Sequence, residues 1–312
     1  METTYIPSII PFLRELQPLE PLPVDVASSA LPCNDIKAVV WDIYGTLLIS
    51  ASGDIEAATF STQHLLRACK AAGIGIAGDH PEQVARDMLQ QYHDAIYREH
   101  ARARADGFPW PEVDIRAIWQ QVFSAFSSSL SFPDSNPAVY VSCSAFVFEL
   151  LSNPVYPMPG MREILTSLHA NGILLGIVSN AQFYTPVIMN YFLSGEAVDT
   201  DAVSLFESDL CVYSYKLLRA KPDRVLFDNL VASARDRYGL HPYNILYVGN
   251  DIRNDIHPAM QAGLKTALFA GDSRSLRQRE HDPKYAGVKP DFIVSHLQQV
   301  CSDIAGFPPV PV

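Results

Sequence analysis

Four short stretches of the chain carry side chains that could perform chemistry. Their carboxylate, hydroxyl, amide and lysine groups are Asp42, Thr46, Ser179, Asn180, Lys221, Asn250, Asp251 and Asp255. Such groups can supply a nucleophile, a fixed positive charge, hydrogen bonds to a developing anion, and hard oxygen ligands for a metal ion. They predict an enzyme active site if the fold brings them together.

Runs of apolar residues predict the elements that would position these groups. Continuous β-branched runs, typical of strands buried on both faces, occur at 36–41, 173–178, 245–248, 266–269 and 292–294. Helical patterns lie between them, for example at 161–170 and 224–238. This alternation predicts a doubly wound α/β parallel sheet. Because the chemical groups follow strand ends, they should converge on one crevice.

Residues 53–157 interrupt that alternation. They contain amphipathic helical patterns at 56–72, 81–105, 112–130 and 138–152 and no good strand run. We therefore expect a helical insert at 53–157, placed over the carboxyl end of a core made of 36–52 and 158–312.

A proline-rich arm is expected at residues 1–35. Its six prolines should prevent regular helix or strand. Its apolar side chains indicate packing on the domain or on a second subunit, which leaves a homodimer open. These side chains are Tyr5, Ile9, Ile10, Phe12 and Leu13.

Composition excludes several classes of protein. The formal charge is −11 and no dense cluster of lysine and arginine occurs, so neither nucleic acid nor an anionic membrane is an expected partner. No run of 18 apolar residues exists to cross a membrane, and the start lacks the pattern of a signal peptide. The five cysteines are widely spaced without metal-binding spacing. We expect a cytoplasmic protein that acts on a small molecule.

The ordered set of motifs resembles the haloacid dehalogenase superfamily. It consists of DxxGT at 42–46, an apolar strand followed by SN at 179–180, KPD at 221–223, and VGNDxxND at 248–255. Each motif alone is weak, but four in this order are specific, and the resemblance covers nearly all of 36–295. It implies a Rossmann-like core with the insert as a helical cap.

The resemblance also implies roles for individual residues. Asp42 would be the nucleophile that forms a covalent aspartyl intermediate, Ser179 and Asn180 would bind the transferring group, and Thr46 would stabilise the turn and contact the substrate. Lys221, preferred to Lys216 because Pro-Asp follows it, would supply a fixed positive charge. Asp255 would orient the lysine or a metal-bound water.

A magnesium ion is expected by the same resemblance. Its ligands would be Asp42, the main-chain carbonyl of Tyr44, and either Asn250 or Asp251. The commoner family motif is GDSxxND, whereas this chain holds Asn250 at the first acid position and has the acid one place later. Which of the two side chains faces the metal stays open.

The sequence supports two interpretations of the leaving group, a phosphorylated alcohol or a halide. Family phosphatases carry an aspartate where this chain has Tyr44, whereas family dehalogenases commonly show DxYGT, because a departing halide needs no proton. However, Phe227 replaces an expected tyrosine, and the acidic fourth motif favours a metal. We lean to magnesium-assisted hydrolysis of a phosphate ester, with 2-haloacid dehalogenation as the alternative and a non-catalytic binding protein as a third hypothesis.

The cap should select the substrate. Its most basic stretch, 92–104, contains Arg98, which could hold a substrate carboxylate or phosphate above Asp42. A solvated helix face is the competing interpretation for any single residue of that stretch.

Overall fold

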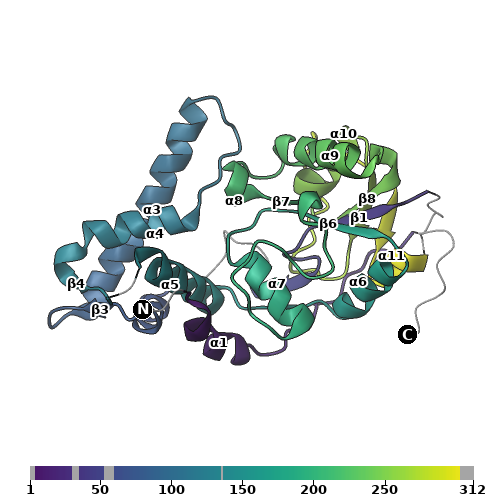
Figure 1. The fold of residues 1–312 in the computed structure, drawn as a ribbon. Coiled ribbons are helices and arrows are strands. Elements are labelled where there is room, and N and C mark those ends of the chain that lie inside the picture. The colour runs from purple at the N-terminus through teal and green to yellow at the C-terminus, as the bar shows by residue number, and fades with distance from the viewer. Residues whose placement is uncertain (1–3, 30–34, 53–59, 135, 303–312) are drawn as a thin grey trace.

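The structure is a computed structural model that describes residues 4–29, 35–52, 60–134 and 136–302. Its larger part is an α/β core built on a parallel sheet whose described strands follow the order β10-β9-β8-β1-β6-β7 (Figure 1). The strands are β1 (Ala38–Trp41), β6 (Leu174–Ser179), β7 (Cys211–Tyr213), β8 (Ile245–Gly249), β9 (Lys265–Phe269) and β10 (Phe292–Val294). The expected doubly wound sheet is confirmed. Only the short edge strand β7 had no counterpart among the predicted strands.

Successive residues of β1 point into different layers. Val39 and Trp41 belong to the core cluster that includes α6 (Met161–Ala170), whereas Val40 packs with α9 (Val225–Tyr238). Both faces of the sheet are therefore covered, which explains why the strand is apolar throughout. The remaining core helices are α7 (Thr185–Ser194), α8 (Ser214–Leu217), α10 (His257–Gln261) and α11 (Gln299–Ser302), with short 3-10 turns at Ser208–Leu210 and Pro242–Asn244 and a π-helical turn at Ile252–Ile256.

A second group of helices forms the cap (Figure 1). It contains α2 (Thr62–Ala71), α3 (Pro81–Ala105), α4 (Ile115–Ala125) and α5 (Pro137–Ser152), with a 3-10 turn at Ser127–Ser129. Trp119, Tyr92 and Phe148 pack ring against ring at its centre. Two details differ from the expectation of an insert without strands. Strand β3 (Gly75–Ile76) pairs with β4 (Leu130–Ser131), and β5 (Val155–Pro157) forms at the end of the expected range.

An antiparallel ribbon lies where the chain leaves and re-enters the core. It pairs β2 (Leu48–Ser50) with β5 (Val155–Pro157). The expected start of the insert at 53–59 lies outside the described residues, so the bounds of the three segments stay predictions. In the described part of the chain, no helix combines the length and apolar character needed to cross a membrane.

The proline-rich arm contains a helix, so the expectation that its prolines exclude regular structure is wrong. Helix α1 spans Ile6–Arg14. Pro7 lies in the first turn, where a missing amide hydrogen costs nothing, and Pro11 is exposed. Ile9 and Leu13 are fully buried against the core cluster, as the apolar pattern of the arm indicated. Burial of this face offsets the hydrogen bond that Pro11 cannot make.

Candidate active site

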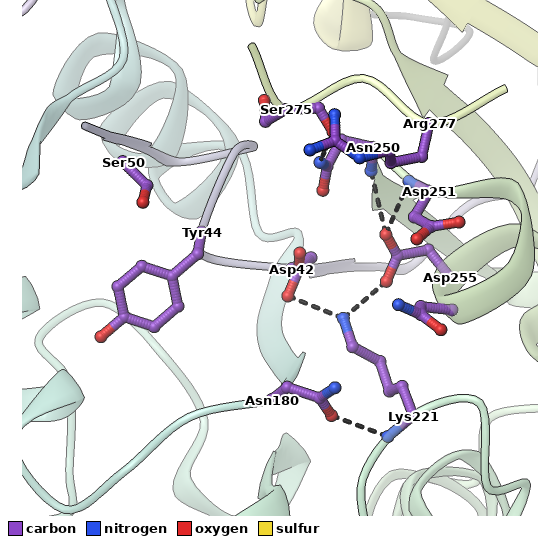
Figure 2. Close-up of a pocket in the computed structure, with 11 residues that line it drawn as sticks. Asp42, Tyr44, Ser50, Asn180, Lys221, Asn250, Asp251, Asp255, Ser275 and Arg277 are labelled. Carbon is purple, nitrogen blue, oxygen red and sulfur yellow. Dashed lines mark hydrogen bonds and ion pairs between the residues drawn. The ribbon is translucent and has the colours of Figure 1, made fainter. Parts of the chain in front are cut away.

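The carboxyl ends of the central strands meet at a small polar cavity of about 110 Å³ (Figure 2). Asp42 follows β1, Asn180 follows β6, and Asn250 with Asp251 follows β8. The expected site residues that line this polar cavity are Asp42, Tyr44, Asn180, Lys221, Asn250, Asp251 and Asp255. The structure therefore brings together groups that are up to about 200 residues apart in the chain, as the rule for parallel strand ends requires.

Lys221 lies at the centre of this cavity. Its ammonium group is 2.7 Å from Asp42 Oδ1 and 2.5 Å from Asp255 Oδ1, and it also donates to the Tyr247 hydroxyl at 3.2 Å. Burial by itself lowers the pKa of Lys221, but the ion pairs with Asp255 and Asp42 raise it overall. The lysine is thus a permanent cation beside the proposed nucleophile. Its backbone amide donates to Asn180 Oδ1 at 2.7 Å, which couples two of the motifs.

Asp255 is held by four donors. Its Oδ1 accepts from Lys221 and from Tyr247, and its Oδ2 accepts from the backbone amides of Asn250 and Asp251 at 3.0 and 2.9 Å. Burial raises the pKa of Asp255 to about 6, and Lys221 offsets part of that rise. This carboxylate therefore positions the lysine and is a stronger base than an ordinary aspartate.

Asp251 is bound to a cation from the same chain. Arg279 donates to both of its carboxylate oxygens, at 3.0 Å from Nε and 2.6 Å from Nη2. Asp251 Oδ1 also accepts from the Arg253 amide at 2.8 Å, so it caps the π-helical turn. A bidentate guanidinium is a strong partner for a carboxylate. Asp251 therefore has a structural role in this arrangement.

Asn250 is also engaged. Its amide nitrogen donates to the Ser275 carbonyl at 2.6 Å, and its Oδ1 accepts from the Thr46 hydroxyl at 3.4 Å.

The turn after β1 requires glycine at position 45. Gly45 has a φ of +83°, and a side chain there would collide with Ser275 and Asn250.

The donor set does not fit a magnesium site well. The described residues contain no group of three or more histidine, cysteine, aspartate or glutamate side chains arranged to hold a metal ion. Asp42 and Asp251 are already paired with Lys221 and Arg279, and Asn250 brings no charge. Magnesium favours carboxylate oxygens, and Asp251 would have to give up its part-buried bidentate pair with Arg279 to supply one.

Tyr44 is poorly placed to be an acid. Its hydroxyl lies 2.9 Å from Thr185 Oγ1, and its ring points away from Asp42 (Figure 2). Burial raises the pKa of Tyr44 above its usual value. A phenol in this state does not release a proton to a leaving group near neutral pH.

Two predicted substrate contacts lie behind the cavity wall. Ser179 and Thr46 are fully buried and do not line the polar cavity. Among the described residues, the Ser179 hydroxyl donates to the Asn180 carbonyl at 3.5 Å, and the Thr46 hydroxyl donates to Asn250. Both residues support their neighbours, whereas Asn180 does reach the cavity.

A second, larger space adjoins the polar cavity. This cap cavity has a volume of about 370 Å³, and its walls include Tyr44, Tyr92, Glu112, Glu149, Asn180 and Tyr184. Tyr44 and Asn180 line both spaces, so a ligand at Asp42 could extend into the cap cavity.

Arg98 lies in neither space. It is an exposed residue of α3, whereas Ile96 and His100 of the same helix line the cap cavity. Its assignment to the substrate therefore has no support from its position, and the solvated helix face describes it better.

Several site residues were absent from the sequence prediction. Ser275 and Arg277 line the polar cavity, and they follow β9, a strand that was predicted. Applying the strand-end rule to that strand would have found them. Tyr247 lies inside an apolar run and Glu149 on a cap helix, and no local signal marks either.

Comparison with known proteins agrees with this fold. A family model described as haloacid dehalogenase-like hydrolase matches residues 36–263. A solved 2-haloacid dehalogenase from Pseudomonas syringae pv. Tomato DC3000 has 18% identity and a TM-score of 0.53, covering 86% of this chain and 97% of that one. A HAD phosphatase from Thermococcus onnurineus has 19% identity and a TM-score of 0.47, covering 88% and 100%. No curated protein gives a significant match. At its identity the dehalogenase structure shows the fold alone.

Proposed function

Because this chain belongs to the haloacid dehalogenase-like hydrolases, we propose that it hydrolyses a carbon–halogen bond through a covalent ester on Asp42, without a metal ion. The observation that carries this proposal is the environment of Tyr44. The position from which family phosphatases protonate the leaving oxygen holds a half-buried phenol bonded to Thr185. A halide leaves as an anion and needs no such proton.

The first step requires a carboxylate and a nearby cation. An oxygen of Asp42 bonds to the substrate carbon while the carbon–halogen bond breaks, and the halide departs with the bonding electrons. Lys221, 2.7 Å from Asp42 Oδ1, keeps that oxygen in place and leaves Oδ2 for the attack. The amide nitrogen of Asn180 donates to no described group, so it can hold the substrate.

The second step requires water and a base. Water attacks the carboxyl carbon of the Asp42 ester, and the bond from that carbon to the oxygen attached to the substrate carbon breaks. The product leaves as an alcohol that carries this former Asp42 oxygen. One proton of the water goes to the product oxygen and the other is released. Asp255, whose pKa is raised to about 6, is the proposed acceptor of the released proton.

Magnesium-assisted hydrolysis of a phosphate ester is the second candidate. It is favoured by the side chains of Asn250 and Asp251, which line the same cavity as Asp42. That reaction would require Asp251 to exchange Arg279 for the metal. A non-catalytic binding role is the third candidate, and it predicts no turnover at all.

One set of assays separates these candidates. The full chain is incubated with 2-chloropropionate, (2-chloroethyl)trimethylammonium, 1-chloro-3,3-dimethylbutane and a panel of phosphorylated metabolites, each with magnesium and with chelator. We expect halide release that chelator does not change. Asp42→Asn should reduce it by at least about 1,000-fold, whereas Asp209→Asn, at an exposed position, should not.

Isotope labelling tests the covalent step directly. In a single turnover in H₂¹⁸O with enzyme in excess, the label should appear in the peptide that contains Asp42 and not in the alcohol. Label in the alcohol would contradict the ester intermediate. Phosphate release that depends on magnesium would replace our proposal with the second candidate.

A further inference from the structure

The cap cavity contains two carboxyl groups without a cationic partner. Glu149 of α5 and Glu112 of the α3–α4 connection form no ion pair in the described part of the chain. Glu112 accepts hydrogen bonds from the Val113 amide and the Ser214 hydroxyl, both at 2.9 Å. No lysine or arginine is among the described residues that line the cavity. His93 and His100 also line the wall, and burial lowers the pKa of His100. The described wall therefore offers an anionic ligand group no fixed positive charge.

Aromatic rings form much of the remaining wall. Tyr92 and Tyr184 are 4% and 6% exposed, and the ring of Phe60 stacks on Phe148 with centroids 5.4 Å apart. The hydroxyl of Tyr92 makes no hydrogen bond within the described residues, so it is available to a group that enters the cavity.

Carboxylates combined with aromatic faces are the chemistry that recognises an organic cation. The negative face of each ring attracts a positive charge, and the attraction increases where water is excluded. We propose that the cap cavity binds a substituted ammonium group of the substrate, held by Glu112, Glu149 and the rings of Tyr92 and Tyr184. The reacting carbon would then lie in the polar cavity, since Tyr44 and Asn180 line both spaces.

This inference extends the proposed function, because it names the far end of the substrate that Asp42 attacks. It predicts preference for a cationic haloalkane over the neutral or anionic ones. The binding preference itself does not require any turnover, so it can be measured independently.

The binding test compares two compounds of nearly the same shape. Choline carries a trimethylammonium group, and 3,3-dimethylbutan-1-ol carries a neutral tert-butyl group instead. Calorimetry with the full-length Asp42→Asn variant measures both, with 3,3-dimethylbutyrate as the anionic comparison. We expect choline to bind at least about tenfold more tightly than the neutral alcohol, and the butyrate to bind most weakly.

Variants then locate the site. Glu149→Gln and Glu112→Gln should each reduce the choline preference several-fold, whereas Glu163→Gln, the same change at an exposed position of α6, should leave it unchanged. Equal binding of choline and the neutral alcohol overturns the inference. A preference for choline that is unchanged in both Glu149→Gln and Glu112→Gln also overturns the inference. If one variant does not fold, the comparison of the two compounds on the parent protein still decides.

The kinetic test separates this inference from the proposed function. Release of chloride from (2-chloroethyl)trimethylammonium should exceed that from 1-chloro-3,3-dimethylbutane by about tenfold in kcat/KM. A choline preference without any halide release would retain the cation site and reject dehalogenation. Equal halide release from both compounds would retain dehalogenation and reject the cation site.

Discussion

The charges of the polar cavity are balanced by side chains of the chain itself. Lys221 serves Asp42 and Asp255, and Arg279 serves Asp251. Each of these carboxylates is almost fully buried, so its charge has to be paired close by. A single lysine shared by two carboxylates leaves one negative charge, which is suited to a nucleophile beside a fixed cation.

Removing that lysine should affect turnover and stability together. In Lys221→Met, Asp42 and Asp255 lose their shared partner in a buried site, so the free energy of unfolding should fall by about 3–5 kcal/mol. Turnover should fall at least about 100-fold, because the charge that orients Asp42 is lost. Denaturant titration and halide release measure the two effects.

The matched control is Lys216→Met. Lys216 pairs with Asp201 at 2.8 Å, but its side chain is 40% exposed. Such a pair contributes at most about 1 kcal/mol. Wild-type turnover in Lys221→Met would refute the assignment of this lysine to the site.

At the level of elements, packing decides structure where local preference opposes it. Helix α1 contains Pro7 and Pro11, yet it forms because Tyr5, Ile9 and Leu13 are buried on one side. The Tyr5 hydroxyl donates to Asp199 at 3.1 Å and its ring contacts Phe183, which ties the helix to the core. This helix is therefore a stabilising part of the domain.

A truncation within α1 tests its contribution. Ile9→Ala leaves a cavity in a fully buried position and should lower the free energy of unfolding by about 2–5 kcal/mol, measured by urea titration. Pro11→Ala, at an exposed position of the same helix, should cause no loss, because it restores a backbone donor. Equal stability of Ile9→Ala and the parent protein would show that α1 does not hold the fold.

At the level of the whole molecule, cap and core enclose a space that neither could form alone. Glu149 comes from cap helix α5, while Tyr184 and Asn180 come from the core. Burial raises the pKa of Glu149 to about 7 and also raises the pKa of Glu112. Closing the molecule thus places acids in an environment that favours their neutral forms.

The stability of the folded chain should carry a pH signature of Glu149. Its folded pKa of about 7 lies above its ordinary value of 4.5, so the folded state binds a proton more tightly than the unfolded state. The associated stability is fully present below pH 4.5 and is lost as the pH rises through about 7. Relative to Glu149→Gln, the free energy of unfolding of the parent protein should fall by on the order of 3 kcal/mol across this pH interval.

Urea titrations at several pH values check this expectation. The other titratable groups that face the same space are unchanged in the variant, so the difference between the two proteins isolates Glu149. These groups are Tyr44, Tyr92, His93, His100, Glu112 and Tyr184. Glu163→Gln serves as the exposed control. If the difference in the free energy of unfolding between the parent protein and Glu149→Gln did not vary with pH, Glu149 would be solvated in the folded state.

Much of the fold and the centre of the site could be predicted because they depend on local patterns and one topological rule. Buried parallel strands are apolar throughout, so β1, β6 and β8 are visible as runs of residues. Parallel strand ends meet at one edge, so Asp42, Asn180 and Asp251 could be expected near one another before any coordinates.

By itself, the sequence determined the layered α/β core, the helical insert and the family to which the chain belongs. Only the tertiary structure decided which polar groups reach the cavity, because side-chain direction depends on packing. Thr46 and Ser179 lie behind the wall, and Asp251 meets Arg279 from 28 residues away. Pairs of this kind leave no trace in local spacing, since the chain between them is free to take many paths until the rest of the molecule packs around it.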